Sequence, residues 1–472
     1  MKRWVWPLGF FLFSNAVFAQ TGRAYDPSSE LPDLNLDKNG GIALTLDDCV
    51  ALAIKGASSV LKAQNDSYVN GAALLQSYIQ FLPNLTAQAN TAESKGTQYL
   101  ATAVPTLVQG SNSTAGYAIG TTLNIFNGLS DLAHLKSAAL RDKASAQNLF
   151  RAKQSIALDI AQGFLNVILD DQLVKIARKN LQQSQERERL LEEQTRVGAK
   201  NLADLFRQKA QMSADESLLL TTENKQRSDQ LLLLQKLRVD VMRDYHFVDY
   251  RFPPEKAEGR FEDEKALVKS GLLNRADLNA STEIADASHW EIKNAFSTYL
   301  PRLDFQASLT SAGAYLYNQN VNGVYSVPAS QTGLYTQLGS QIEYSVGLYL
   351  TWSIFDRFVT QSNVAQARAR ASDADIDAID TRNQVQADVR IAYANYRTAI
   401  QQLRASREGL TSARKAFEVI EGRYEVGSAN FIDLITAQTT LLQAESANAQ
   451  AMMNFTLQSK AVEFATGELR VN

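Results

Sequence analysis

The side chains that most often perform chemistry are sparse in this sequence of 472 residues. The chain has one cysteine, Cys49, and three scattered histidines, His134, His246 and His289. A single cysteine cannot form an intramolecular disulfide, and isolated histidines do not build a metal cage. The sequence contains no P-loop, no HExxH, no dinucleotide fingerprint and no plausible Ser-His-Asp cluster. We therefore predict that the protein is not an enzyme and has neither a metal site nor a cofactor.

One polar pattern does occur twice, each time after a glycine. The segments are RVGAKNLADL from 196 and EVGSANFIDL from 425. Asn430 can cap a helix and place Asp433 at its third position, where a carboxylate complements exposed N–H groups. Asn201 and Asp204 repeat that arrangement. Helix capping is therefore one explanation of both aspartates.

Long helices must position these turns. Residues 106–252 and 329–472 contain no proline, and these blocks of 147 and 144 residues each enclose one turn. In the second block apolar residues recur with a period near 3.5, which is typical of a coiled-coil seam. They are Val385, Val389, Ala392, Tyr396, Ala399, Leu403, Leu410, Phe417, Ile420 and Tyr424. A helix from about 129 to 196 would span on the order of 100 Å.

The sequence contains an internal duplication. Pro83 and Pro301, within FLPNLTAQAN and YLPRLDFQAS, are 218 positions apart, and Asp204 and Asp433 are 229 apart. Each predicted copy has a helix, a β-hairpin, a long helix, a turn and a second helix. The first copy covers 45–245, with its hairpin at about 84–126 and its turn at 197–201. The second covers 263–472, with its hairpin at about 302–355 and its turn at 426–430.

Two further features concern the membrane. Lys2 and Arg3 precede an apolar stretch and the small-residue site at Ala19, so we expect residues 1–19 to be a cleaved signal peptide. No run of 18 apolar residues follows, so any integral membrane part must consist of strands. The predicted return strand alternates apolar and polar residues, as a strand between lipid and water does. Its lipid-facing residues would include Leu348, Leu350 and Trp352.

The assembly follows from the number of strands. Two hairpins supply four strands of about ten residues, which cannot close a sheet, so other copies must satisfy the edges. Two copies would give eight strands and a barrel filled by its own side chains, whereas three copies give twelve strands and begin to leave an open lumen. Three is therefore the smaller number of copies that makes a duct. The balance of 47 basic and 50 acidic residues gives no case for a nucleic-acid partner.

These features together resemble the TolC family of outer membrane efflux proteins. The resemblance runs from about Leu44 to Leu469 and is carried by TLDDCVALAI, by the doubled LP-then-strand junctions, by NRADLNAS from 274, and by the two turn motifs. It implies a helix-dominated, internally duplicated chain whose homotrimer combines a twelve-stranded membrane β-barrel with an α-helical coiled-coil barrel. An equatorial belt would draw on residues 20–44, residues 246–262 and the chain end.

The resemblance also implies a gate at the periplasmic entrance. The matching acidic and hydrogen-bonding positions are Asp204, Tyr424 and Asp433, whereas Thr436 and Ala429 replace charged residues of some relatives. A gate role for Asp433 thus stands beside capping. The turns lie farthest from the strands, so an adaptor would contact Val197, Gly198, Asn201, Val426, Gly427 and Asn430.

The predicted function is an exit duct in the cell outer membrane that extends into the periplasm. It would serve a tripartite efflux or type I secretion system, joined by a periplasmic adaptor (membrane fusion) protein to an inner membrane pump of RND or ABC type, with outer membrane lipid around its strands. A secreted helical pore-forming protein and a periplasmic coiled-coil scaffold are the alternatives. The transported substrate is not determined by the sequence.

Overall fold

A computed structural model describes residues 42–100, 106–248, 260–261, 263–321, 324–326 and 330–470. The predicted signal peptide 1–19 lies outside these residues, as do most of the segments 20–44 and 246–262. The described chain forms two compact units. A helical unit comprises Met1–Asn70, Asp142–Glu283 and Asp375–Asn472, and a sheet unit comprises Gly71–Arg141 and Ile284–Ala374.

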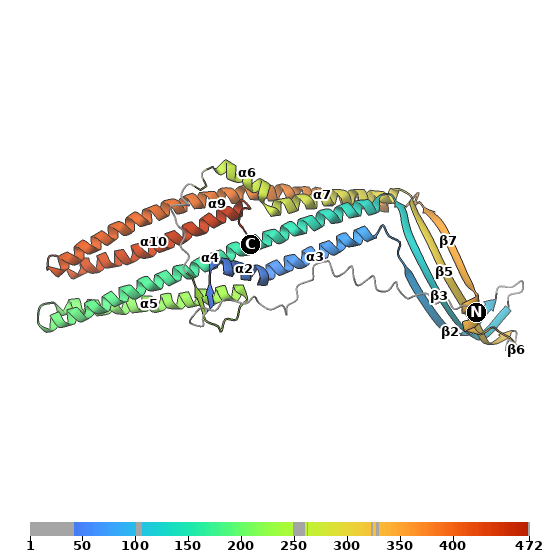
Figure 1. Cartoon of the computed structure of the whole chain (residues 1–472), viewed down its shortest axis with the longest axis horizontal. Coiled ribbons are helices and arrows are strands. Elements are labelled where there is room, and N and C mark those ends of the chain that lie inside the picture. Colours follow the sequence, from blue (N-terminus) through green and yellow to red (C-terminus); the bar gives the residue numbers. More distant parts are fainter. Residues whose placement is uncertain are drawn as a thin grey trace, which may run out of the picture. The chain divides into compact units, whose positions relative to one another are not determined.

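Helices dominate the fold. They are α2 (Leu46–Gly56), α3 (Ser58–Ile79), α4 (Ser130–Arg196), α5 (Leu202–Leu237), α6 (Glu264–Asn274), α7 (Ala276–Phe296), α8 (Leu334–Ser340), α9 (Val359–Glu425) and α10 (Phe431–Ala465). In the helical unit α5 runs back along α4, and α10 runs back along α9 (Figure 1). Each pair is therefore a helical hairpin that ends in one of the two predicted turns.

The predicted helix start at Thr45 is confirmed. The Thr45 hydroxyl accepts a hydrogen bond from the Asp48 N–H at 3.2 Å, and the Asp48 carboxylate accepts one from the Thr45 N–H at 3.1 Å. This reciprocal pair is a capping box, which satisfies two N–H groups at the start of α2.

The sequence predicts one helix at the start of each copy, from 45 to about 81 and from about 263 to 299, but neither helix is continuous. Each is broken by one extended residue, at Ala57 between α2 and α3 and at Arg275 between α6 and α7. At the second break the buried Arg275 guanidinium lies 2.5 Å from Asp277 and 2.6 Å from Asp388 on α9. These contacts hold the extended backbone because a buried guanidinium must be paired.

The sheet unit contains one antiparallel sheet. Its strands are β2 (Thr86–Leu100), β3 (Thr106–Asn127), β5 (Arg302–Val321), β6 (Val324–Ser326) and β7 (Ile342–Thr351). β3 pairs with β2 and β5, and β7 pairs with β5 from Arg302 to Ser311 (Figure 1). Four strands of about ten residues were expected, but β3 has 22 and β5 has 20. The second connection is no simple hairpin, since it contains β6 and α8.

The two larger apolar clusters of the helical unit lie away from its turns. In the first, the short parallel pair β1 (Ile42–Leu44) and β4 (Tyr245–Phe247) packs with Cys49, Phe164 and Leu237. In the second, the predicted seam of α9 packs against Phe455 and Val462 of α10. Seven of the ten seam residues are buried, which confirms the heptad prediction; they are Val385, Val389, Ala392, Tyr396, Ala399, Leu403 and Phe417.

Candidate functional site at the two helical turns

The turns that connect α4 to α5 and α9 to α10 share one backbone geometry. Gly198 and Gly427 both have φ of +78°, a left-handed conformation that glycine adopts without strain. The Gly198 N–H donates to the Thr195 carbonyl at 3.0 Å, and the Gly427 N–H donates to the Tyr424 carbonyl at 3.1 Å. Each glycine thus ends a helix and reverses the chain within a few residues.

Asparagine caps the helix after each turn. The Asn430 side chain accepts a hydrogen bond from the Asp433 N–H at 2.9 Å, as predicted. The Asn201 side chain instead accepts from the Ala203 N–H at 3.0 Å. Asn201 is thus the N-cap of α5 and Asp204 lies in its first turn, so the predicted repeat of the arrangement is confirmed, although Asn201 bonds the second N–H of the helix and Asn430 the third.

Tyr424 lies in the last turn of α9 and is half-buried. Its ring is 6.1 Å from that of Phe431, and the Lys200 ammonium lies over it at 4.2 Å from the centroid. The Tyr424 hydroxyl is buried and has no hydrogen-bond partner among the described residues. Burial raises the pKa of Tyr424, and the charge of Asp204 raises it further. Asp204 and Tyr424 thus interact electrostatically, although no hydrogen bond joins them among the described contacts.

The two predicted gate aspartates differ in their surroundings. Asp204 is partly buried, and its carboxylate lies 3.4 Å from the Arg207 guanidinium one turn later. Asp433 is exposed, and no side chain in the described part of the protein pairs with its carboxylate. Asp433 therefore presents an uncompensated negative charge at the start of α10.

A buried arginine joins the two hairpins. Arg187 of α4 donates hydrogen bonds to Gln438 of α10 and, at 3.5 Å, to Glu421 of α9. Its side chain is only 13% exposed, and burial lowers the pKa of Arg187 against the opposing charge of Glu421. Gln438 continues the network by donating to Asn180 of α4 at 2.8 Å. This network fixes the α9–α10 hairpin to α4.

This network was not predicted from the sequence, although two residue spacings pointed to it. Arg187 follows Asn180 by one heptad, so both lie on one face of α4. Glu421 lies three residues before Tyr424, on the same face of α9. A cavity of about 340 Å³ borders these groups. Its lining includes Arg187, Leu191, Lys200, Glu421, Tyr424 and Leu434.

The turns also offer apolar surface. Val197 is 72% exposed and Val426 is 79% exposed. Beneath them Leu191, Leu205 and Phe431 form a buried cluster that anchors both turns. The turn residues are thus rigidly held and accessible, which is the combination that a docking surface needs.

The predicted lipid-facing residues lie in the sheet unit. Leu348 and Leu350 of β7 are 65% and 69% exposed, and Trp352, just after β7, is 58% exposed. They share one face with their β5 partners, since Leu348 pairs with Phe305 and Leu350 with Leu303. This face is a continuous apolar surface.

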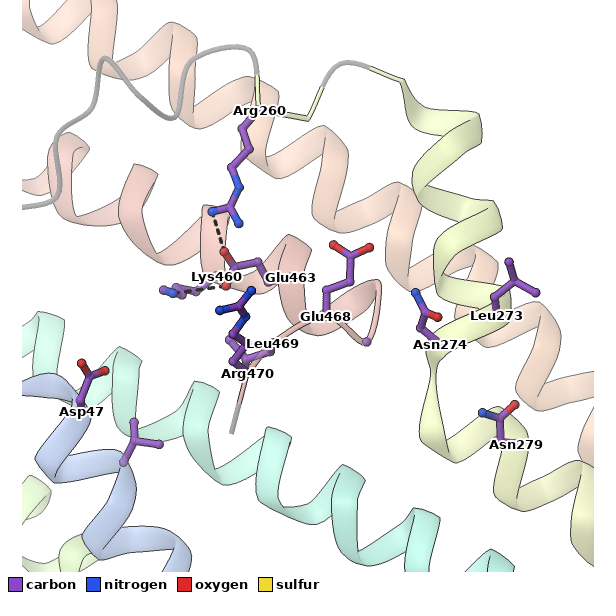
Figure 2. A pocket seen from close by; sticks show the side chains of 12 residues that line it. Asp47, Arg260, Leu273, Asn274, Asn279, Lys460, Glu463, Glu468, Leu469 and Arg470 are labelled. Carbon is purple, nitrogen blue, oxygen red and sulfur yellow. Dashed lines mark hydrogen bonds and ion pairs between the residues drawn. The ribbon is translucent and has the colours of Figure 1, made fainter. Parts of the chain in front are cut away.

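A cavity of about 1230 Å³ lies elsewhere in the helical unit, between α2, α6, α7 and the end of α10. Figure 2 shows Arg260 and Lys460 converging on Glu463, at 2.7 Å and 3.2 Å. Across the cavity Glu468 accepts a hydrogen bond from Ser270 at 2.7 Å. Most charges of this cavity are thus already paired within the chain.

Among the described residues, no three His, Cys, Asp or Glu side chains are arranged to hold a metal ion. None of the helices in these described ranges combines the length and the apolar character that crossing a membrane requires.

Comparison with known proteins agrees with this architecture. Residues 267–468 match the family model described as "Outer membrane efflux protein". Outer membrane protein TolC of Escherichia coli is 22% identical over 445 residues, which cover 89% of this chain and 85% of that protein. Outer membrane efflux protein BepC of Brucella suis is 20% identical over 354 residues, covering 74% of this chain and 72% of BepC.

Solved structures show the same fold. VceC of Vibrio cholerae superposes with a TM-score of 0.71 at 17% identity, covering 89% of this chain and 96% of VceC. The Campylobacter jejuni channel CmeC gives a TM-score of 0.73 at 17% identity, covering 90% and 86%. Both of these solved proteins are described as outer membrane proteins or channels, and this chain shares their fold. Residues 267–468 thus match the outer membrane efflux family, and the chain is similar to TolC and BepC, in agreement with the resemblance to the TolC family found in the sequence.

Proposed function

We propose that three copies of this chain form the exit duct of a tripartite efflux or type I secretion system. Each copy contributes β2, β3, β5 and β7 to a twelve-stranded membrane barrel, and the helices of the three internally duplicated chains form a coiled-coil tunnel. The duct conducts its cargo passively, so the protein catalyses no reaction and uses no cofactor.

The observation that carries this proposal is the pair of open sheet edges. Among the described strands, β2 pairs only with β3 and β7 only with β5, so each has one unpaired side. Unpaired N–H and C=O groups cannot remain in lipid. The exposed apolar face of Leu348 and Leu350 supports a position of these edges in lipid, where pairing of β7 of one copy with β2 of the next would satisfy them.

The turns supply the remaining functions. Val197, Gly198 and Asn201, together with Val426, Gly427 and Asn430, dock the tip of a periplasmic adaptor, which connects the duct to an RND or ABC pump. Asp204, Tyr424 and Asp433 form the periplasmic gate, and the Arg187 network holds it closed. Three copies of Asp433 around one axis attract cations at the mouth.

Membrane fractionation tests the assembly. We expect the mature protein in the outer membrane fraction as a trimer that persists in mild detergent, measured by sedimentation. A soluble monomer would favour a periplasmic scaffold, and insertion into host-cell membranes from the medium would favour a secreted pore-forming protein. Either result would overturn the proposal.

A further inference from the structure

The connection between β6 and β7 folds back over one face of the sheet as α8. The Ser311 hydroxyl of β5 donates to the Leu338 carbonyl at 2.8 Å, and the Tyr117 hydroxyl of β3 donates to the same oxygen at 3.3 Å. A Cβ atom at Gly313 would lie 3.0 Å from side-chain atoms of Gln337 and Leu334. A side chain at 313 would thus press against α8, so glycine at this position favours the close approach of α8 to the sheet.

Two glutamines fasten this segment to the edge of β5. The Gln337 amide donates to the Ala314 carbonyl at 2.9 Å and accepts from the Ala314 N–H at 3.0 Å. The Gln331 amide donates to the Leu316 carbonyl at 2.7 Å and accepts from the Leu316 N–H at 2.9 Å. Since β7 pairs with β5 only as far as Ser311 and β6 pairs with it only from Gln319, these side chains replace a neighbouring strand between those two residues.

The strand register identifies the face that α8 covers. Ser311 lies opposite Tyr117 of β3 and Ile342 of β7. Directly opposed residues of neighbouring strands point to the same side of the sheet, and residues two positions apart along one strand do so as well. Ile342 therefore shares its face with Tyr344, Val346, Leu348 and Leu350, so α8 lies at the end of the apolar surface.

Aromatic side chains mark both ends of that surface. Trp352 is 58% exposed at the end next to the helices, and Tyr344 is 73% exposed toward α8. At roughly 3.3 Å per residue they are about 26 Å apart along the strand. An apolar band about 25 Å tall between aromatic girdles is typical of a strand that crosses the outer membrane.

Beyond α8 the character of the sheet changes. Tyr335 on α8 is 89% exposed. β3 continues past this level, away from the helices, with the small and polar residues Gly110-Ser111-Asn112-Ser113. This stretch of β3 has no large apolar side chain, whereas β5 and β6 beyond α8 carry the exposed residues Tyr317, Val324 and Tyr325.

We propose that α8 lies in the headgroup layer of the outer leaflet, with Tyr335 in contact with lipid headgroups. Gln331 and Gln337 hold the helix at that depth, and the lipid-covered face ends beneath it. Tyrosine suits this layer because its ring is apolar and its hydroxyl is polar. This inference rests on the proposed function, which puts the apolar face of the sheet in lipid.

Depth-dependent fluorescence quenching tests the inference on the full-length protein in phosphatidylcholine vesicles. An environment-sensitive fluorophore is attached to Leu348→Cys, Tyr335→Cys or Asn112→Cys. Native Cys49 is buried and burial raises the pKa of its thiol to about 12, so the wild-type protein is the unlabelled control. The quenchers are lipids brominated near the headgroup, lipids brominated near the chain end, and aqueous iodide.

We expect chain-end bromines to quench the label at 348, near-headgroup bromines to quench the label at 335, and only iodide to quench the label at 112. Adding Gln331→Ala and Gln337→Ala should shift the 335 label toward iodide quenching and leave the 348 label unchanged. A 348 label quenched only by iodide would remove the proposed membrane function itself. A lipid-quenched 348 label beside a 335 label quenched only by iodide, or equally by chain-end bromines, would overturn the position of α8 alone.

Discussion

The Arg187 guanidinium of α4 lies 3.5 Å from the Glu421 carboxylate of α9, although 234 positions separate the two residues in the sequence. The same guanidinium bonds Gln438 of α10. One buried cation therefore contacts both helices of the neighbouring hairpin, directly beneath the proposed gate.

Arg187→Ala should loosen that attachment. We expect the free energy of unfolding to fall by about 2–3 kcal/mol, because a buried charged hydrogen bond is lost and Gln438 is left unpaired on that side. In planar bilayers we expect a higher single-channel conductance. Arg178→Ala is the matched control on the same helix, since Arg178 pairs with Glu223 at 2.8 Å but is 68% exposed. That exposed pair should contribute less than about 1 kcal/mol.

Unchanged conductance in a destabilised Arg187→Ala trimer would show that the network is structural only. An equal effect of both substitutions would show that general loss of charge on α4 accounts for the result.

Capping and gating can be separated at the start of α10. Asp433→Asn removes the charge but keeps the backbone N–H that donates a hydrogen bond to the Asn430 side chain. We therefore expect lower cation selectivity and weaker block by trivalent cations, measured in single-channel recordings. Asn430→Ala removes the cap and should lower the free energy of unfolding by about 1 kcal/mol while selectivity stays the same. If Asp433→Asn only lowered stability, helix capping would be its whole role.

The local features of the turns could be predicted from the sequence. A glycine at the left-handed position and an asparagine before the next helix act through their own backbone neighbours. The seam of α9 was predictable for a similar reason, since the heptad period places Val385 and Val389 on one face.

Contacts between segments far apart in the chain were not predictable in this way. The Arg275 break depends on Asp388, 113 positions away, and the Arg187 network depends on how two hairpins pack. The fold of α8 onto the sheet depends on Gln337, which reads as an ordinary polar loop residue until β5 presents an unpaired edge to it. Sequence periodicity reports which face of an element is apolar, but not which distant polar group meets it.

Adaptor docking should depend on the exposed valines of the turns. Val197→Asp and Val426→Asp each place a charge on an accessible apolar surface, so we expect loss of adaptor co-purification and of efflux, with the thermal midpoint of the trimer unchanged. Leu220→Asp is the control, because Leu220 is 61% exposed on α5 away from the turn. Normal adaptor binding by both turn variants would place the docking surface elsewhere.

Two aspartates of the helical unit have pKa values shifted in opposite directions. The Asp170 side chain is 1% exposed, and burial raises the pKa of Asp170 despite the Lys225 ammonium at 2.6 Å. Burial acts upward on Asp277 too, but hydrogen bonds from Arg275 and the charge of Arg151 outweigh it and lower the pKa of Asp277.

The sign of the pH dependence follows from these shifts. An unfolded aspartate has a pKa of about 3.9. Asp170 binds its proton more tightly in the folded state, so its contribution to stability increases as the pH falls through its raised pKa. Asp277 contributes stability above about pH 3.9, and this contribution is lost as the pH falls through its lowered pKa.

Thermal unfolding in detergent, measured as the pH is lowered from neutral to below the unfolded pKa of about 3.9, tests both effects. Relative to wild type, Asp170→Asn should become less stable on acidification, whereas the deficit of Asp277→Asn should shrink. Parallel curves for the two variants and wild type would contradict both assignments.

An arginine on the apolar face of β7 should destabilise the protein in a bilayer more than an arginine on the polar face. Leu348→Arg, at the middle of the exposed apolar surface, should lower the free energy of unfolding in a bilayer by about 2–4 kcal/mol. A charge on the opposite face should be tolerated or change conductance. Thr351→Arg is one such substitution, but Thr351 lies opposite Arg302, and like charges in opposed positions destabilise a strand pair. Ser345→Arg is the better control, because Ser345 lies opposite Ser308. Refolding yield into vesicles as a function of urea measures the difference, and equal losses for Leu348→Arg and Ser345→Arg would mean that neither face of the strand meets lipid.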